Sequence, residues 1–330
     1  MLPDDEDTVF ARVNLLAALS SHVLAFLQYG NEKLYFLISI KKSEDNNIKE
    51  GIFVNFVVCL KQVPDTSEVR IDPLTNTLMR EGVPSIINPY DAHGLEEAIR
   101  LKEKVGGKVT IVCMGPPQAK EALRKAMTYG ADRAILLSDR AFGGSDSLAT
   151  AYILSMALQK IHETEPIDLV FAGKEAIDGD TAQTGPGIAQ RLGFPQLTYA
   201  IRVRELTDTA ITVERKTESG RQIVEAQLPA LLTVEKELND LRYATLPNMM
   251  KAAAYEPEVW DAKTLPFDIK QMGLKGSPTS VSRIFAPPGR SGGEIMDATK
   301  DPAATAASVV QKIFQQNIIM VNPHAKGGKS

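Results

Sequence analysis

The stretch VFAGKEAIDGDTAQTGPGIAQRLG, from Val170 to Gly193, places an apolar run directly before a loop of polar and small residues. The run is typical of a buried strand, and the residues after the loop have the spacing of a helix. A helix that begins beside a glycine-rich loop presents free backbone N–H groups and partial positive charge. This chemistry suits an anionic ligand, most simply a phosphate or a pyrophosphate.

The residue types within the loop support the binding of such an anion. Four glycines allow a ligand to approach the backbone closely, namely Gly173, Gly179, Gly185 and Gly187. Side-chain hydrogen bonds can come from Thr181, Gln183 and Thr184. Lys174 can add positive charge.

Acidic residues also stand in the loop, at Glu175, Asp178 and Asp180. Because like charges repel, we expect these acids to cap the helix, to brace the loop or to bind a ribose hydroxyl, and not to hold a phosphate. The run Asp180-Thr181-Ala182-Gln183 fits a capping-box-like pattern, which predicts that the helix begins near Asp180. The alternative is an ordinary turn that needs Asp and Gly for its own conformation. From the loop alone, both interpretations stay open.

A second polar element, Asn88-Pro89-Tyr90-Asp91, opens another predicted helix. Asn88 is a candidate N-cap, and Pro89 stands at the first helical position. These side chains can face the same crevice as the loop, although an ordinary helix cap also explains them.

The chain positions both elements through an alternation of strands and helices that begins at Asn55. The expected strands cover 55–61, 108–115, 133–138 and 168–173, and the expected helices cover 88–105, 116–130 and 145–162. This alternation predicts an α/β fold with a doubly wound, mostly parallel sheet. Residues 200–235 alternate with turn signals and predict antiparallel strands added at an edge. In an open parallel sheet ligands bind beyond the carboxyl ends of the strands, where Cys59 and Met114 also stand.

The pattern divides the chain into three parts, covering 1–53, 54–236 and 237–330. The last part forms an extended C-terminal arm, with a linker over 286–305 and a final helix over about 306–316. The first part lacks an uninterrupted span of about 20 apolar residues, so a transmembrane helix is not expected. Its acidic start, MLPDDED, does not fit a signal peptide.

A further hypothesis is that residues 1–53 are not translated in the native organism. Lys49-Glu50-Gly51 can be encoded by AAG-GAG-GNN, which contains a purine-rich ribosome-binding sequence. Two codons later stands Val54, and GTG is both a valine codon and a bacterial start codon. The native chain would then begin at Val54, and its intact mass decides the question.

The bulk composition excludes several classes of protein. The chain has 330 residues, 44% of them hydrophobic, and a net charge of −4, so it can bury a large core but offers no basic field to nucleic acid. Lys and Arg are spread along the chain, without a basic patch for a membrane surface. The sequence lacks a Walker A motif and a G-x-G-x-x-G motif, and its four histidines have no metal-ligand spacing. Two cysteines in apolar runs predict reduced core residues and a cytoplasmic location.

Five motifs together resemble the beta subunit of the electron transfer flavoproteins. They are VVCLKQVPDT (57–66), NPYDAHGLEEAIRLKEK (88–104), GADRAILL (130–137), GKEAIDGDTAQTGP (173–186) and LNDLRYATLPNMMKA (238–252). The motifs occur in the family's order, and the resemblance covers nearly everything from Val54 to about Ala286, whereas residues 1–53 have no counterpart in it. The resemblance implies a nucleotide-binding domain over 54–236 and a heterodimer with an alpha subunit that carries the electron-transferring FAD.

The resemblance also implies an adenine nucleotide in this subunit, either AMP in ordinary members or a second FAD in members that bifurcate electrons. The implied ligand contacts are Cys59, Asn88, Pro89, Tyr90, Asp91, Met114, Gly173, Lys174, Glu175, Ala176, Ile177, Asp178, Gly179, Asp180, Thr181, Ala182, Gln183 and Thr184. At Cys59 and Met114 the family varies, so backbone contact is expected there. Ordinary members have an acid where Gly179 stands and a residue similar to asparagine near Ala182. The small residues here, and the segment GLKGSPTSVSRIFAP (273–287), are closer to the bifurcating form and favour FAD.

In the bifurcating form, a hydride from NADH reduces the flavin bound partly by this subunit. One electron then reaches the alpha-subunit flavin and an acyl-CoA or similar dehydrogenase, and the other reaches a low-potential carrier such as ferredoxin or flavodoxin. The flavin supplies this chemistry, so no residue of this chain is expected to be a general acid or base.

The segment RYATLPNMMKA (242–252) resembles the family's recognition loop for partner dehydrogenases. Leu246, followed by Pro247, is the expected anchor in a partner pocket, flanked by Met249 and Met250. The alternative is a Leu-Pro turn packed on the chain's own core. A different class of function also fits the composition and the fold pattern, namely a regulatory module that binds an adenine nucleotide without any redox role.

Overall fold

The computed structural model describes the main chain of residues 13–19, 22–29, 32–38, 47–48, 53–65, 70–71, 78–79, 84–280 and 294–315. Side chains are described within 53–65, 84–280 and 294–315. The chain divides into one compact unit up to Ile284 and a second from Phe285, and each is described by itself. Within the described residues, no helix is long and apolar enough to cross a membrane.

The centre of the first unit is a ten-stranded sheet with the order β15-β14-β13-β16-β12-β5-β10-β11-β17, in which β4 also pairs with β13. Its parallel strands are β5 (Val54–Leu60), β10 (Gly107–Met114), β11 (Arg133–Leu137), β12 (Leu169–Gly173), β16 (Ala230–Val234) and β17 (Glu258–Trp260). β13 (Gln196–Leu206) pairs in parallel with β16 and with β4 (Asn47–Ile48). β13, β14 (Ala210–Thr217) and β15 (Gly220–Gln227) form an antiparallel meander. The predicted α/β fold with a mostly parallel sheet is confirmed.

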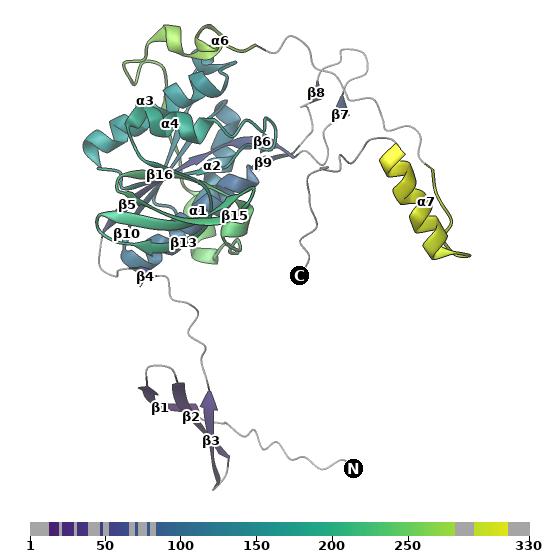
Figure 1. Cartoon of the computed structure of the whole chain (residues 1–330). Coiled ribbons are helices and arrows are strands. Elements are labelled where there is room, and N and C mark those ends of the chain that lie inside the picture. Colours follow the sequence, from purple (N-terminus) through teal and green to yellow (C-terminus); the bar gives the residue numbers. More distant parts are fainter. Residues whose placement is uncertain are drawn as a thin grey trace, which may run out of the picture. The chain divides into compact units, whose positions relative to one another are not determined.

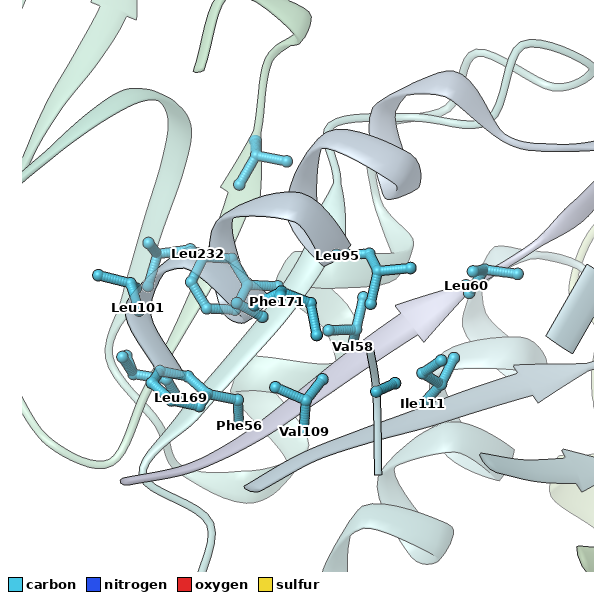
Figure 2. Close-up of a cluster of buried hydrophobic side chains, with 14 of the residues drawn as sticks. Phe56, Val58, Leu60, Leu95, Leu101, Val109, Ile111, Leu169, Phe171 and Leu232 are labelled. Carbon is cyan, nitrogen blue, oxygen red and sulfur yellow. The ribbon is translucent and has the colours of Figure 1, made fainter. Parts of the chain in front are cut away.

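Helices cover both faces of the sheet (Figure 1). α1 (Pro89–Val105) and α2 (Lys120–Met127) pack on one face, and α3 (Ser147–Thr164) and α4 (Thr184–Leu192) pack on the other. Alternate residues of β5 enter the two cores, since Phe56 and Val58 face α1 while Val57 faces α3. Figure 2 shows the core on the α1 face, where Leu95 and Leu101 of α1 lie among side chains from β5, β10, β12 and β16.

One strand differs from the prediction for residues 200–235. The meander of β13, β14 and β15 is antiparallel as predicted, but β16 is parallel and lies inside the sheet between β12 and β13. All five residues of β16 are buried, as in a strand covered on both faces. The continuous apolar run ALLTV is typical of such a strand, and its two-sided burial overrides the local turn signals around it.

The remaining elements are short or lie at the ends of the chain. They are the antiparallel sheet of β1 (Val13–Leu19), β2 (His22–Tyr29) and β3 (Glu32–Ile38), the pair β6 (Gln62–Pro64) and β9 (Ser85–Ile87), the pair β7 (Arg70–Ile71) and β8 (Leu78–Met79), α5 (Leu246–Ala253), α6 (Gly273–Gly276) and α7 (Pro302–Gln315). α7 begins four residues before the predicted final helix, because Pro302 suits the first helical position. The segment 281–293, which holds part of the predicted linker, lies outside the described residues.

Candidate functional site

A cavity of about 280 Å³ opens beyond the carboxyl ends of β5, β10 and β12. The chain runs from β5 to β10 on one side of the sheet, and β12 pairs with β5 on the other side, so the cavity lies at a topological switch point. Of the expected ligand contacts, those that line it are Cys59, Asp91, Met114, Gly173, Lys174, Glu175, Ala176, Gly179, Asp180, Thr181, Ala182, Gln183 and Thr184. The loop after β12 therefore forms one wall of the cavity.

Two helix N-termini face this cavity, and they differ in how they are capped. The Asp146 carboxylate accepts hydrogen bonds from the backbone N–H groups of Leu148 and Ala149, so the first turn of α3 is satisfied by its own chain. The first turn of α4 has no side-chain cap, and its residues Thr184 and Gly185 line the cavity. An uncapped helix N-terminus at a cavity wall is suited to an anion.

The prediction that the helix after the loop begins near Asp180 is wrong. α4 begins at Thr184 with Gln183 at the N-cap position, and the side chain of Asp180 is not a cap. Asp180 and Ala182 instead have φ values of 50° and 53°, in the left-handed region. Each such residue costs about 1–3 kcal/mol, and this conformation prevents the helix from extending back to Asp180. Ala182 is followed by Gln183 in the right-handed region, an alternation that turns successive N–H groups toward one concave side.

Gly173 and Gly179 lack a side chain for different physical reasons. A Cβ atom at Gly173 would lie 2.3 Å from Oδ1 of Asp91, so the fold itself requires glycine there. At Gly179 a Cβ atom would meet no protein atom within 4 Å, and Gly179 lines the cavity. The absence of a side chain at Gly179 is therefore not needed for internal packing, and it leaves space at the cavity wall.

Asn88 braces the loop from the neighbouring element. It stands at the N-cap position of α1, but its side chain makes no capping hydrogen bond. Its Nδ2 donates to the backbone oxygen of Glu175 at 2.8 Å, and its Oδ1 accepts from the N–H of Ile177 at 3.2 Å. Asn88 is 1% exposed and does not line the cavity, so its contacts fix the shape of the loop.

Asp91 joins the ends of two strands at the floor of the cavity. Its Oδ2 accepts from the N–H of Lys61, which follows β5, at 2.7 Å. Its Oδ1 accepts from the N–H of Gly173, at the end of β12, at 2.9 Å. Burial raises the pKa of this carboxyl to about 7, although the hydrogen bonds from Lys61, Asn88 and Gly173 oppose that effect.

Three charged side chains of the loop, Lys174, Glu175 and Asp178, are paired within the chain. The Nζ of Lys61 lies 2.6 Å from Asp178, so this acid braces the loop across the mouth of β5. The ammonium of Lys174 lies 3.4 Å from both Glu175 and Glu235. It also lies over the rings of Tyr90 and Tyr199, at 5.8 Å and 5.6 Å from their centroids.

Five of the expected ligand contacts do not line the cavity, namely Asn88, Pro89, Tyr90, Ile177 and Asp178. Tyr90 instead donates its hydroxyl hydrogen to Glu175 at 3.2 Å. Lining residues that the sequence reasoning missed include Ser145, Asp146, Ser147, Thr150, Leu154 and Ile188. The run GGSDS (143–147) could have indicated Ser145, Asp146 and Ser147, because it marks the start of a helix. It does not show that this helix start faces the cavity.

The cysteines behave as the apolar runs predict. Cys59 and Cys113 are both buried and free. Burial raises the pKa of each thiol to about 12, so both are neutral small core residues. Cys59 nevertheless lines the cavity at the end of β5.

Residues 75–265 match the electron transfer flavoprotein domain. The electron transfer flavoprotein subunit beta of Clostridium acetobutylicum is 48% identical over 266 residues, which are 81% of this chain and 100% of that protein. This chain belongs to the electron transfer flavoprotein family. Its resemblance to the beta subunit is thereby confirmed, and beta subunits of this family pair with an alpha subunit.

Two further relatives have names of other kinds. Protein FixA of Azotobacter vinelandii is 52% identical over 267 residues, covering 79% of this chain and 95% of that protein. The caffeyl-CoA reductase-Etf complex subunit CarD of Acetobacterium woodii is 46% identical over 267 residues, covering 81% of this chain and 100% of that protein.

The segment that resembles the recognition loop of electron transfer flavoproteins forms α5. Leu246 is 68% exposed, and Met249 and Met250 are also exposed. Within α5 only Ala252 is buried. The alternative of a Leu-Pro turn packed on the chain's own core is therefore wrong, because Leu246 and Pro247 form the first turn of a helix whose apolar side chains face outward.

Proposed function

We propose that this beta subunit binds the adenine-nucleotide part of a second FAD in the cavity at the carboxyl ends of β5, β10 and β12, and that it takes part in flavin-based electron bifurcation. The uncapped N-terminus of α4, beside the loop 173–184, is the observation that carries the proposal. In this assignment, the backbone N–H groups of Gln183, Thr184 and Gly185 hold the pyrophosphate. Asp178 and Glu175 are assigned to bracing the loop and not to the pyrophosphate, since Asp178 is paired with Lys61 and Glu175 with Lys174.

The donor set fits a nucleotide phosphate group on chemical grounds. Hydroxyls of Ser147, Thr150 and Thr181 line the same cavity as the free first turn of α4. Cys59 and Leu154 add an apolar wall that suits a base or a ring. The site therefore combines backbone donors for phosphate with an apolar surface.

Space at Gly179 and Ala182 favours FAD over AMP. Gly179 lacks a side chain where no protein atom would oppose one, which leaves room beyond a single phosphate. A cavity of about 280 Å³ encloses only part of an FAD molecule, so its flavin ring would extend beyond this chain toward a partner. When bound, FAD supplies the hydride and single-electron chemistry, while these residues supply position and electrostatics.

We further propose that the heterodimer takes electrons from NADH in the cytoplasm, and passes them to an acyl-CoA-type dehydrogenase and to a ferredoxin or a flavodoxin. The relative CarD is named as a subunit of a complex with a caffeyl-CoA reductase, which supports a dehydrogenase-type partner. The exposed Leu246 on α5 is the anchor that we assign to that partner.

The cofactor content of the purified heterodimer tests the ligand assignment. Co-expression with the alpha subunit should give two FAD and no AMP per heterodimer, measured after acid release and chromatography. One FAD with one AMP would instead identify an ordinary member of the family. A colourless chain that binds AMP and associates only with itself would support the non-redox regulatory module.

Replacing Leu246 with alanine tests the partner assignment. The exposed leucine should fill a partner pocket, so Leu246→Ala should raise the KM for the dehydrogenase by about tenfold or more. Flavin content should not change, because Leu246 is not among the residues that line the cavity. Loss of bound flavin in this variant would show a structural role instead.

A further inference from the structure

The segment around α5 is fastened to the domain on both sides, while its outer surface stays exposed. After α5, the Tyr255 hydroxyl accepts the N–H of Ala134 at 2.9 Å, and the Tyr255 carbonyl accepts from Arg124 at 3.2 Å. Before α5, Asn239 and Arg242 hold the chain against α1. Between these two anchors, Leu246 and the two methionines face outward.

The anchor before α5 centres on a buried glutamate of α1. Glu96 is 2% exposed. Its Oε1 and Oε2 lie 3.1 Å and 2.9 Å from the Nε of Arg242, and its Oε2 also accepts the backbone N–H of Arg242 at 3.2 Å. The other end of the guanidinium is held by Glu103, with distances of 2.5 Å and 2.9 Å. Arg242 is thus fixed through both its backbone and its side chain.

Asn239 adds a second attachment to the same helix. Its Nδ2 donates to the carbonyl of His93 at 3.0 Å and to Glu97 at 3.0 Å. Its Oδ1 lies 3.0 Å from the Nδ1 of His93. Both attachments therefore lie on α1, the helix whose first turn carries Asp91 at the nucleotide cavity.

A buried ion pair of this kind is better suited to fixing geometry than to stabilising the fold. The cost of removing Glu96 from water offsets much of its attraction to Arg242. The planar guanidinium spans two carboxylates in one orientation, which the flexible ammonium of lysine does not reproduce. Three residues separate Arg242 from Leu246, so the direction of Arg242 sets where α5 starts.

We propose that Arg242 is a positioning residue for partner recognition: held by Glu96 and Glu103 on α1, it orients α5 so that Leu246 presents its side chain to the dehydrogenase. This inference rests on the partner role proposed for Leu246. Arg242 acts through the position of Leu246, and α1 fixes the partner-recognition helix and the nucleotide loop to one rigid element.

The test compares Arg242→Lys with a matched substitution elsewhere in the heterodimer. Arg204 pairs with Glu214, another buried glutamate, at 2.5 Å on the β13–β14 meander, so Arg204→Lys removes a similar fork far along the sheet from α5. Arg242→Lys should raise the KM for the dehydrogenase about three- to tenfold with kcat unchanged, a shift that corresponds to the usual size of coupled contacts. Arg204→Lys should leave that KM unchanged. Glu103→Gln, at an exposed carboxylate, should give a smaller rise than Arg242→Lys, with flavin content unchanged.

A double-mutant cycle with Leu246→Ala separates positioning from direct contact. If Arg242 acts through Leu246, Arg242→Lys should add less than twofold to the KM once Leu246 is alanine. Full additivity of the two changes would overturn the proposal, as would an equal rise in KM from Arg204→Lys. If Leu246→Ala itself leaves the KM unchanged, the partner role fails and the positioning role fails with it. If Leu246→Ala raises the KM and Arg242→Lys does not, only the positioning role is overturned.

Discussion

At the scale of single residues, Asp91 joins the strand ends that form the floor of the cavity. Its two oxygens accept backbone N–H groups from Lys61 and Gly173, and each bond fixes one neighbouring strand. The motif around Asp91 predicted its place at this crevice, but it did not predict that Asp91 joins two strand ends. That role depends on β5 and β12 being neighbours in the sheet. The two strands are far apart in the sequence: Asn55 at the start of β5 contacts Asp168 just before β12, and these residues are 113 positions apart.

The buried carboxyl of Asp91 should give stability a dependence on pH. Burial raises its pKa from 3.8 to about 7, so the folded chain binds this proton more tightly than the unfolded chain. Its contribution to stability is fully present below pH 3.8 and is lost as the pH rises through about 7. The thermal unfolding midpoint of the wild type minus that of Asp91→Asn should therefore decrease as the pH is raised from 5 to 8, as measured by thermal denaturation.

A carboxyl whose pKa is shifted in the opposite direction provides the control for this prediction. The hydrogen bonds from Ala149, Thr279 and Leu148 outweigh desolvation at Asp146 and lower the pKa of that carboxyl. Its contribution is therefore present at neutral pH and is lost on acidification. Asp146→Asn should leave the difference from wild type flat between pH 5 and pH 8, and an Asp91→Asn difference that is equally flat would contradict the assignment.

At the scale of elements, the start of α3 ties the cavity to residues 277–279, which follow α6. Oδ1 of Asp146 caps the helix, while its Oδ2 accepts from the N–H and the Oγ1 of Thr279 at 3.1 Å and 2.8 Å. The N–H of Asp146 donates to Ser277 at 2.8 Å. One carboxylate thus holds a helix end and a distant segment together.

Removing that carboxylate should cost more than an ordinary helix cap. Loss of the cap alone costs about 1 kcal/mol, and Asp146→Ala also frees the Thr279 contacts, so we expect about 2–3 kcal/mol of destabilisation in all. Asp146→Asn retains an Oδ1 acceptor for the cap but loses the Oδ2 acceptor for Thr279, so it should lose about 1–2 kcal/mol. Chemical denaturation of the two variants measures the difference, which is the contribution of the cap, and equal losses would show that the cap contributes nothing.

The existence of the main helices and strands between 54 and 236 followed from the sequence, whereas α5, β17 and the ends and neighbours of elements did not. The apolar periods of α1 and α3 predicted both helices to within a few residues. The capping pattern at Asp180 failed because the left-handed residues Asp180 and Ala182 form a loop that no local propensity specifies. β16 was assigned to the wrong place because the apolar run gives burial but does not give its neighbours.

At the scale of the whole molecule, the described core begins where the family resemblance begins. β5 starts at Val54 and pairs with β10 and β12 in the middle of the sheet. Among the described residues before it, β4 pairs with β13 over two residues, at Glu205 and Leu206. Two relatives that match over their whole length cover 81% of this chain.

These observations lead to a prediction for a chain that begins at Val54, read as Met. Because the central strands and both helical layers lie after that residue, the shortened chain should form the heterodimer with the same flavin content. Its unfolding midpoint should lie within about 2 °C of that of the long chain, since a two-residue strand pairing contributes well under 1 kcal/mol. The intact mass of the protein from its own host should correspond to the shorter chain. A native mass that includes residues 1–53, or loss of heterodimer on shortening, would show instead that the extension is part of the working protein.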